Sequence, residues 1–134
     1  MLKAQFLIRK VILFVKLTGE LDQSSVEKLR VRVSELITNY NIAYIVINCK
    51  ELSFMDSSGI GFIIGRFNKL KGCNGKIILC EMNELITRIV NVSGLSRIVT
   101  IKETEEEASL YVEGLYEKVY KMRIQFWFKE CYSF

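Results

Sequence analysis

Strand-like and helix-like segments alternate along most of this chain, and this alternation restricts the fold more than any other feature. The run 43–49 is rich in β-branched and aromatic residues, which is typical of a buried strand. The segment that follows it repeats apolar residues at helical spacing, namely Ile60, Ile63, Ile64, Phe67 and Leu70. Strands that alternate with helices pair side by side through crossover connections. The pattern therefore predicts an α/β fold with a largely parallel sheet.

The other expected strands extend this pattern in both directions. They are residues 3–8, 11–18, 76–82 and 98–101, with a turn of the chain expected at 19–23. The first two would form an opening hairpin, which makes the sheet mixed. The predicted order is β-β-α-β-α-β-α-β-α, a mixed and mostly parallel sheet of about five strands with about four helices.

Short polar signals mark where the helices should begin and end. Capping boxes are expected at Ser24 with Glu27 and at Thr104 with Glu107, and Asn83 is a further N-cap candidate. Two helices should end at glycine-containing positions, Gly72 and Ser93-Gly94. Since the chain has no proline, Gly, Asn and Ser must make every break.

The composition narrows the possible functions. A chain of 134 residues, half hydrophobic and a quarter charged, is typical of one globular domain. No apolar run reaches the roughly 18 residues that a membrane span needs, and no signal peptide is visible, so we expect a soluble, cytoplasmic protein. The net charge of +4 is modest and shows no basic stripe, which argues against direct nucleic-acid binding.

Residue types that much enzyme chemistry requires are missing. The chain has no histidine, so neither a Ser-His-Asp site nor the commonest ligand set of catalytic zinc can be built. The cysteines form no CxxC pair and are expected to be small core residues or unreactive thiols: Cys49, Cys73, Cys80 and Cys131. We therefore expect no metal, no cofactor and no catalytic residue.

The segment Phe54–Gly61 carries the most chemical information. Its Asp56-Ser57-Ser58-Gly59 places two hydroxyls on a strand-to-helix connection, and such connections gather at the carboxyl ends of parallel strands. A serine in that position can be modified. Taken alone, Asp56-Ser57-Ser58 is also a plausible N-cap cluster. The glycines Gly59, Gly61 and Gly65 fit close packing of helix on sheet better than a nucleotide loop.

Three motifs together resemble a known family. They are Leu17-Thr18-Gly19-Glu20-Leu21-Asp22, Leu52 to Gly61, and Ser93-Gly94-Leu95. In combination they resemble the anti-sigma factor antagonists of the STAS domain family, and the sporulation members above all. The resemblance covers roughly residues 3–115. It implies a single STAS domain over 1–115 and leaves 116–134 as a C-terminal extension of unknown role.

The resemblance implies a binding module that phosphorylation controls, and no enzyme. In this family the unphosphorylated form binds an anti-sigma factor that is also a serine kinase holding ATP or ADP, and thereby releases the sigma factor. The first serine after the aspartate, here Ser57, accepts the phosphate that inactivates the protein, and a PP2C-type phosphatase removes it. The implied partner-binding residues are Asp22, Asp56, Ser58, Gly59 and Ile60. The oligomeric state stays open.

Simple electrostatics agrees with such a switch. We expect a phosphate on Ser57 to be held by the backbone N–H groups of Ser58, Gly59 and Ile60, because helix starts favour anions. It would add about 1.5 to 2 negative charges beside Asp56 and near Asp22.

Several alternatives remain open from the sequence. Asp22 fits a turn-stabilising role as well as it fits a partner contact. The same domain would also suit a STAS regulator of a stress-response or transport system with another partner. An enzymatic serine activated by Asp56 is unattractive, because aspartate is a weak base near neutral pH. The aromatic and basic extension fits a long final helix, an appendage, a membrane-surface segment or a partner-binding segment, and an exposed aromatic cluster would favour self-association.

Overall fold

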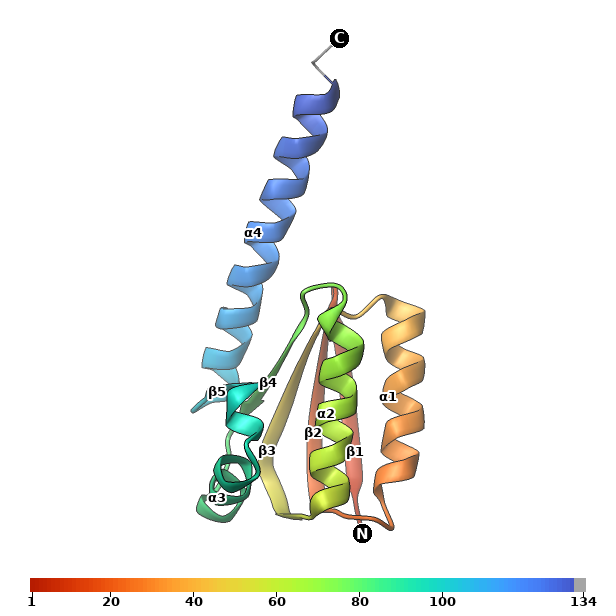
Figure 1. The fold of residues 1–134 in the computed structure, drawn as a ribbon, viewed down its shortest axis with the longest axis vertical. Coiled ribbons are helices and arrows are strands. Elements are labelled where there is room, and N and C mark those ends of the chain that lie inside the picture. Colours follow the sequence, from red (N-terminus) through yellow and green to blue (C-terminus); the bar gives the residue numbers. More distant parts are fainter. Residues whose placement is uncertain (132–134) are drawn as a thin grey trace.

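A five-stranded mixed sheet forms the centre of the molecule (Figure 1). The computed structural model describes the backbone of residues 1–131 and the side chains of residues 1–118. The strands lie in sequence order across the sheet: β1 (Lys3–Arg9), β2 (Ile12–Leu21), β3 (Tyr44–Met55), β4 (Lys76–Cys80) and β5 (Thr100–Lys102). β1 is antiparallel to β2, and the other neighbours are parallel. The predicted fold class is confirmed.

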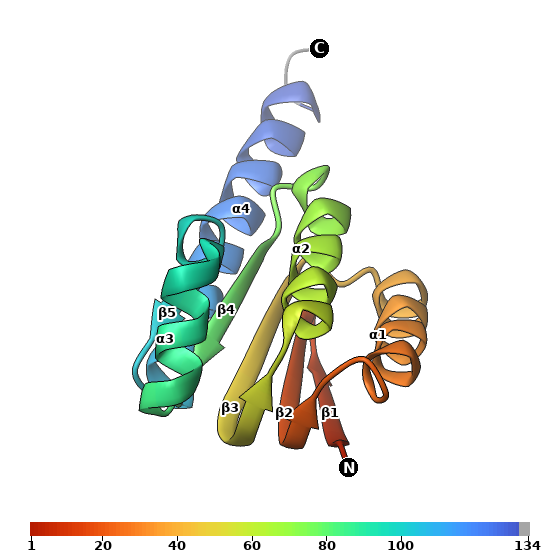
Figure 2. The same cartoon turned by 60° about the horizontal axis from the view of Figure 1, so that its bottom comes forward.

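Helices cover both faces of this sheet (Figure 2). They are α1 (Val26–Tyr40), α2 (Ser57–Lys71), α3 (Glu84–Ser93) and α4 (Glu105–Cys131), with a 3-10 turn at Leu95–Arg97. The first three pack on one face, over the larger apolar cluster, and α4 lies on the other face, over a smaller one.

Alternating side chains of the strands build these two clusters. In β2, Leu13, Val15 and Leu17 belong to the cluster under α1–α3, while Ile12 and Phe14 belong to the cluster under α4. This is the period of two that a strand imposes on its side chains. Residues 44–47 of β3 and 77–80 of β4 are continuous hydrophobic runs because both of their faces are buried, which is typical of parallel strands covered on both sides.

Several predicted helix boundaries are confirmed. Asn83 caps α3 through its side chain, which accepts a hydrogen bond of 2.8 Å from the N–H of Ile86. Gly94 ends the same helix with φ of 86°, a left-handed conformation that glycine adopts without steric cost. At α4, the Thr104 hydroxyl accepts from the N–H of Glu107 at 3.1 Å, as the predicted capping box requires.

The predicted turn at 19–23 and the capping box at Ser24 are wrong. β2 continues through Leu21, so the chain turns only at Asp22. The residue before α1 is Ser25, whose side chain makes no capping hydrogen bond to the helix. Instead the Asp22 carboxylate accepts from the N–H groups of Ser24 and Ser25, at 3.1 and 3.2 Å. An aspartate carboxylate is a better hydrogen-bond acceptor than a serine hydroxyl, so Asp22 and not Ser24 binds the free N–H groups of this turn.

The thiols behave as the composition predicts. Cys49 and Cys80 are buried, and desolvation raises the pKa of each to about 12, so both are protonated and unreactive near neutral pH. Cys73 is exposed. The side chain of Cys131 lies outside the described residues.

The last helix extends beyond residue 115, where the sequence placed the end of the domain. It continues unbroken to Cys131. The sequence left several alternatives open for the extension, and the backbone up to residue 131 agrees with a long final helix. The side chains that motivated the membrane-surface and partner-binding alternatives lie outside the described residues. Within the described part of the chain, no helix combines the length and the apolar character that crossing a membrane requires.

Candidate functional site

The predicted site residues gather at the carboxyl edge of the sheet, where β2 and β3 end side by side. Leu21 pairs with Met55 in the register of these strands, so the loops that follow them are neighbours. The N–H of Asp56 donates to the carbonyl of Leu21 at 3.2 Å. Asp22 and Ser57, which are 35 positions apart in the chain, therefore belong to one surface.

The carboxylate of Asp56 connects the two loops. Its Oδ1 accepts from the N–H groups of Ser58 at 2.8 Å and Gly59 at 3.3 Å, which makes Asp56 the N-cap of α2. Its Oδ2 accepts from the N–H of Gln23 at 3.2 Å, in the loop after β2. A negative group at a helix start is also favoured by the helix dipole. Asp56 therefore fixes both the start of α2 and its position relative to the Asp22 loop.

The two adjacent serines have different environments. Ser57 is exposed at the first position of α2, and its hydroxyl makes no hydrogen bond within the described residues. Ser58 is half-buried, and its N–H is bound to Asp56. The hydroxyl of Ser57 is thus the more accessible of the two. The sequence also allowed Asp56-Ser57-Ser58 to be an N-cap cluster, and in the structure the residue that caps α2 is Asp56.

The N–H groups of Ser58, Gly59 and Ile60, which we expect to hold a phosphate on Ser57, already donate hydrogen bonds in the unphosphorylated protein. The first two donate to the Asp56 carboxylate, and the N–H of Ile60 donates to the carbonyl of Asp56 at 3.1 Å. The capping aspartate already occupies the anion site at the helix start, because it is the nearest carboxylate to those donors.

Asp22 organises the other loop. Its Oδ1 accepts from the hydroxyls of Ser24 at 2.7 Å and Ser25 at 3.0 Å. These hydrogen bonds, that of Ser24 foremost, lower the pKa of Asp22 below its ordinary value of 3.8. The turn-stabilising role is therefore present in the structure. It is compatible with a partner contact, because the other carboxylate oxygen is engaged by no hydrogen bond among the described residues.

The lowered pKa of Asp22 predicts a specific dependence of stability on pH. A group whose pKa is lower in the folded state stabilises the fold above its ordinary pKa of 3.8, and this contribution is lost as the pH falls through the folded value. We expect Asp22→Asn to be less stable than the wild type near neutral pH, with a difference that shrinks below roughly pH 4. Urea unfolding of both proteins from about pH 3 to pH 6 tests this. A difference that stays constant over that range would contradict it.

Gly59 is required by close packing. A Cβ on Gly59 would lie 2.5 Å from Cγ of Met55 and 3.0 Å from the carbonyl oxygen of Leu21. Gly61 and Gly65 face open space, with nothing within 4 Å of an added Cβ. The close-packing prediction is therefore correct for Gly59 and wrong for the other two. Gly59 lets the first turn of α2 approach the end of β2, which brings the Asp22 and Ser57 loops together.

The sequence interpretation missed two residues of this surface. Gln23 contributes the N–H that binds Asp56, and only the neighbouring ends of two strands reveal it. Phe54 is 40% exposed at the end of β3, although it is a large apolar residue. An aromatic side chain on the outward side of a strand that ends at the Asp-Ser-Ser motif was a signal that could have identified it.

Throughout the described part of the chain, no group of three or more His, Cys, Asp or Glu side chains is arranged to hold a metal ion. The surface instead combines exposed hydroxyl, carboxylate and aromatic groups on a rigid scaffold, which is typical of a recognition surface.

Comparisons with known proteins place this arrangement in a family. The model of the STAS domain matches residues 3–108. An anti-sigma F factor antagonist of Paenibacillus polymyxa is 35% identical over 102 residues, which cover 76% of this chain and 87% of the relative. An anti-sigma-B factor antagonist of Bacillus subtilis is 32% identical over 92 residues, covering 69% of this chain and 83% of the relative.

Solved structures agree with the sequence relatives. The anti-sigma factor antagonist SpoIIAA in its unphosphorylated form superimposes with a TM-score of 0.75 at 34% identity, covering 84% of this chain and 97% of that one. The phosphorylated form of the Bacillus cell fate determinant SpoIIAA gives a TM-score of 0.66 at 33% identity, covering 82% and 99%. With a family model along most of its length and relatives above 30% identity, this protein belongs to the STAS domain family.

Proposed function

We propose that this protein is a phosphorylation-switched anti-sigma factor antagonist. Its unphosphorylated form binds an anti-sigma factor that is also a serine kinase, and this binding releases a sporulation sigma factor. Phosphorylation of Ser57 by that kinase abolishes binding, and a PP2C-type phosphatase restores it. Relatives named as anti-sigma F factor antagonists, and SpoIIAA structures in both phosphorylation states, support this proposal.

The observation that carries the proposal is the exposed hydroxyl of Ser57. It lies at the first position of α2, between the Asp56 N-cap and the solvent, where a kinase can reach it. A phosphate there is favoured by the dipole of α2, so the fold should tolerate the modification. We expect the phosphate to weaken partner binding more than it affects the stability of the fold, because the added charge lies beside the carboxylate of Asp56.

We place the contact surface on both loops of the carboxyl edge. Asp22, Asp56, Ser58 and Ile60 form its centre, and the buried Gly59, also predicted as a partner-binding residue, supports them from below. Phe54 supplies an exposed aromatic group next to the switch residue, and aromatic residues are common anchors at the centres of interfaces. Because Gln23 and Asp56 hold the loops together, a partner would meet a preorganised surface, which lowers the entropy cost of binding.

We infer that the protein acts by binding alone, in the cytoplasm and without a cofactor. Family members of this kind are generally regulators without catalytic activity. An enzymatic serine would need a base, and both oxygens of Asp56 accept hydrogen bonds from backbone N–H groups. The chain contains no histidine that could carry a proton to it.

Mass spectrometry after incubation with the candidate kinase and ATP tests the assignment of the switch. We expect stoichiometric phosphate on Ser57 in the wild type and in Ser58→Ala, and none in Ser57→Ala. Phosphate on Ser58 would overturn the site while keeping the class of protein. No phosphate and no complex with the kinase would overturn the proposed partner.

A second candidate function has specific support. Anti-sigma-B factor antagonists are 27% to 32% identical to this chain, so the same surface could serve an antagonist of an anti-sigma-B factor. The two functions differ in the partner. Parallel binding measurements with an anti-sigma-F and an anti-sigma-B factor would separate them, and we expect the tighter complex with the former, since the identities to anti-sigma F factor antagonists reach 35%.

A further inference from the structure

Helix α4 runs past the end of the domain. It begins at the carboxyl edge of the sheet, crosses the face opposite α1–α3, and is held near the other edge by the β1–β2 hairpin. Arg9 forms an ion pair of 3.6 Å with Glu113, and the ammonium of Lys10 lies 5.0 Å from the centre of the Tyr116 ring. The helix then continues to Cys131, and in both views its backbone stands clear of the described strands and helices (Figures 1 and 2).

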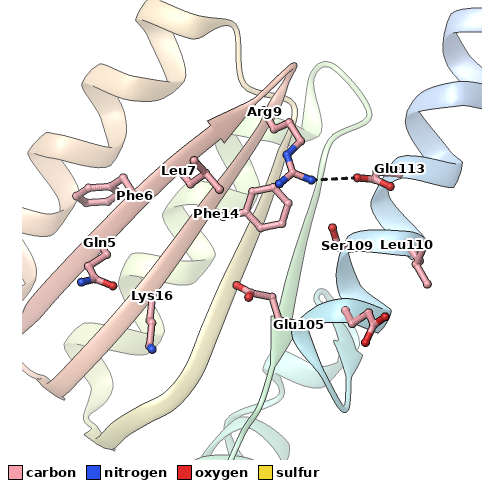
Figure 3. Close-up of a pocket in the computed structure, with 11 residues that line it drawn as sticks. Gln5, Phe6, Leu7, Arg9, Phe14, Lys16, Glu105, Ser109, Leu110 and Glu113 are labelled. Atoms are coloured by element: carbon pink, nitrogen blue, oxygen red, sulfur yellow. Dashed lines mark ion pairs between the residues drawn. The ribbon is translucent and has the colours of Figure 1, made fainter.

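A groove follows the part of α4 that lies over the sheet. It has a volume of about 630 Å³ and separates β1 and β2 from the first turns of α4 (Figure 3). Its apolar lining includes Leu7, Phe14 and Leu110, and Leu7 and Leu110 are 55% and 65% exposed. The groove exists because α4 packs on β3, β4 and β5 and covers Ile12 and Phe14 of β2, whereas it leaves Leu7 of β1 exposed.

The two ends of α4 carry opposite charge. Residues 105–113 contain four glutamates and no basic residue, while residues 118–131 contain four basic residues and one glutamate. The same distal segment is rich in large apolar residues: Ile124, Phe126, Trp127 and Phe128. Glutamates 105, 106 and 113 line the α4 side of the groove, and Arg9 and Lys16 line its strand side. Because Arg9 pairs with Glu113, the negative charge that complements the basic distal segment of a second copy lies on Glu105 and Glu106.

We propose that two copies of this chain associate through α4 in an antiparallel arrangement, with residues 117–131 of each copy seated in the groove of the other. An antiparallel pair places each acidic segment beside a basic one, whereas a parallel pair would place like charges together. The contact is isologous and closes on itself, so it yields a dimer and no filament. Centred between residues 117 and 118, it brings Glu106 level with Lys129 of the second copy.

The proposed dimer leaves the surface around Ser57 free. α4 leaves the sheet at the edge opposite the start of α2, so residues 116–131 point away from the ends of β2 and β3 (Figure 1). Dimerisation and binding of an anti-sigma factor would therefore use separate parts of the molecule. The proposal also gives the extension over residues 116–134 a role of its own, distinct from the domain over 1–115.

Light scattering coupled to size-exclusion chromatography of the full chain tests the proposal. We expect twice the mass of one chain for the wild type, and the mass of one chain for Leu110→Glu at the same concentration. Val92→Glu is the matched control, because Val92 is 84% exposed on α3, away from the groove, and it should remain dimeric. Circular dichroism of both variants checks that they are folded.

A charge-reversal pair tests the antiparallel direction. We expect Glu106→Lys and Lys129→Glu each to weaken the dimer at least tenfold, and the double variant to regain most of the loss. A dimer that Leu110→Glu leaves intact would overturn the proposed interface. A wild type that stays monomeric but sediments with vesicles of anionic phospholipid would overturn it too, and would assign the extension to a membrane surface instead.

Discussion

Once phosphorylated on Ser57, the protein is expected to bind its anti-sigma factor about a thousandfold more weakly. This loss corresponds to about 4 kcal/mol. Two adjacent effects supply it. The phosphate adds about 1.5 to 2 negative charges next to the carboxylate of Asp56, and it adds bulk at the centre of the proposed contact surface.

The hydrogen bonds at the start of α2 give a reason to expect that the phosphate stays exposed to solvent. The backbone N–H groups of Ser58 and Gly59, which would otherwise bind it, already donate to Asp56. The phosphate must therefore stay at the surface, where an approaching partner has to desolvate it. Asp22 lies in the neighbouring loop, and its lowered pKa keeps it ionised near neutral pH, so it adds to the negative field.

Calorimetric titration with the anti-sigma factor and ADP measures this effect. We expect Ser57→Ala to bind as tightly as the unmodified wild type and to be unaffected by kinase and ATP. Ser58→Ala is the matched control, and it should still lose affinity when it is phosphorylated. If phosphorylated wild type bound with unchanged affinity, Ser57 would not be the switch, whatever its modification state.

The Gly59→Ala substitution is expected to destabilise the fold by about 2 kcal/mol, while Gly61→Ala in the same helix should stabilise it by about 0.5 to 1 kcal/mol. The added methyl group at Gly59 has no space between Met55 and the carbonyl of Leu21. At Gly61 it enters open space, and the helix gains from the reduced entropy of the unfolded chain.

Gly59→Ala should affect the site as well as the stability. To relieve the contact with Leu21, the first turn of α2 must move away from the end of β2, which strains the hydrogen bond from Asp56 to Leu21. We therefore expect slower phosphorylation of Ser57 in this variant and a normal rate in Gly61→Ala. Urea unfolding and a kinase time course give the two readouts. Equal stability of the two variants would show that the approach of α2 to β2 does not depend on Gly59.

Much of the fold could be predicted from the sequence, because local signals agree with the final structure. The apolar runs of β3 and β4, the N-cap of Asn83 and the left-handed Gly94 each depend on residues close together in the chain. The fold class follows from the alternation of such segments. The motif around Ser57 was recognisable for the same reason, since its residues are consecutive.

The sequence alone did not reveal which groups form hydrogen bonds with one another across the carboxyl edge of the sheet. The carboxylate of Asp56 could have capped α2 only, yet it also binds the N–H of Gln23, which is 33 positions earlier. Likewise, Ser24 fitted a capping box, but Asp22 was the stronger acceptor once β2 had continued to Leu21. These choices depend on the register of β2 and β3, which sets the distance between the loops.

The sequence by itself therefore determined the elements, their order and the place of Ser57, which we propose as the switch, because each is encoded by spacing and composition within a short stretch. Tertiary structure alone decided that Gly59 is indispensable for close packing while Gly61 is not, and that the N–H groups at the start of α2 are already bound. It also decided that α4 leaves an open groove beside β1 and β2. All three depend on distances between segments far apart in the chain, and only the packed sheet and helices fix those distances.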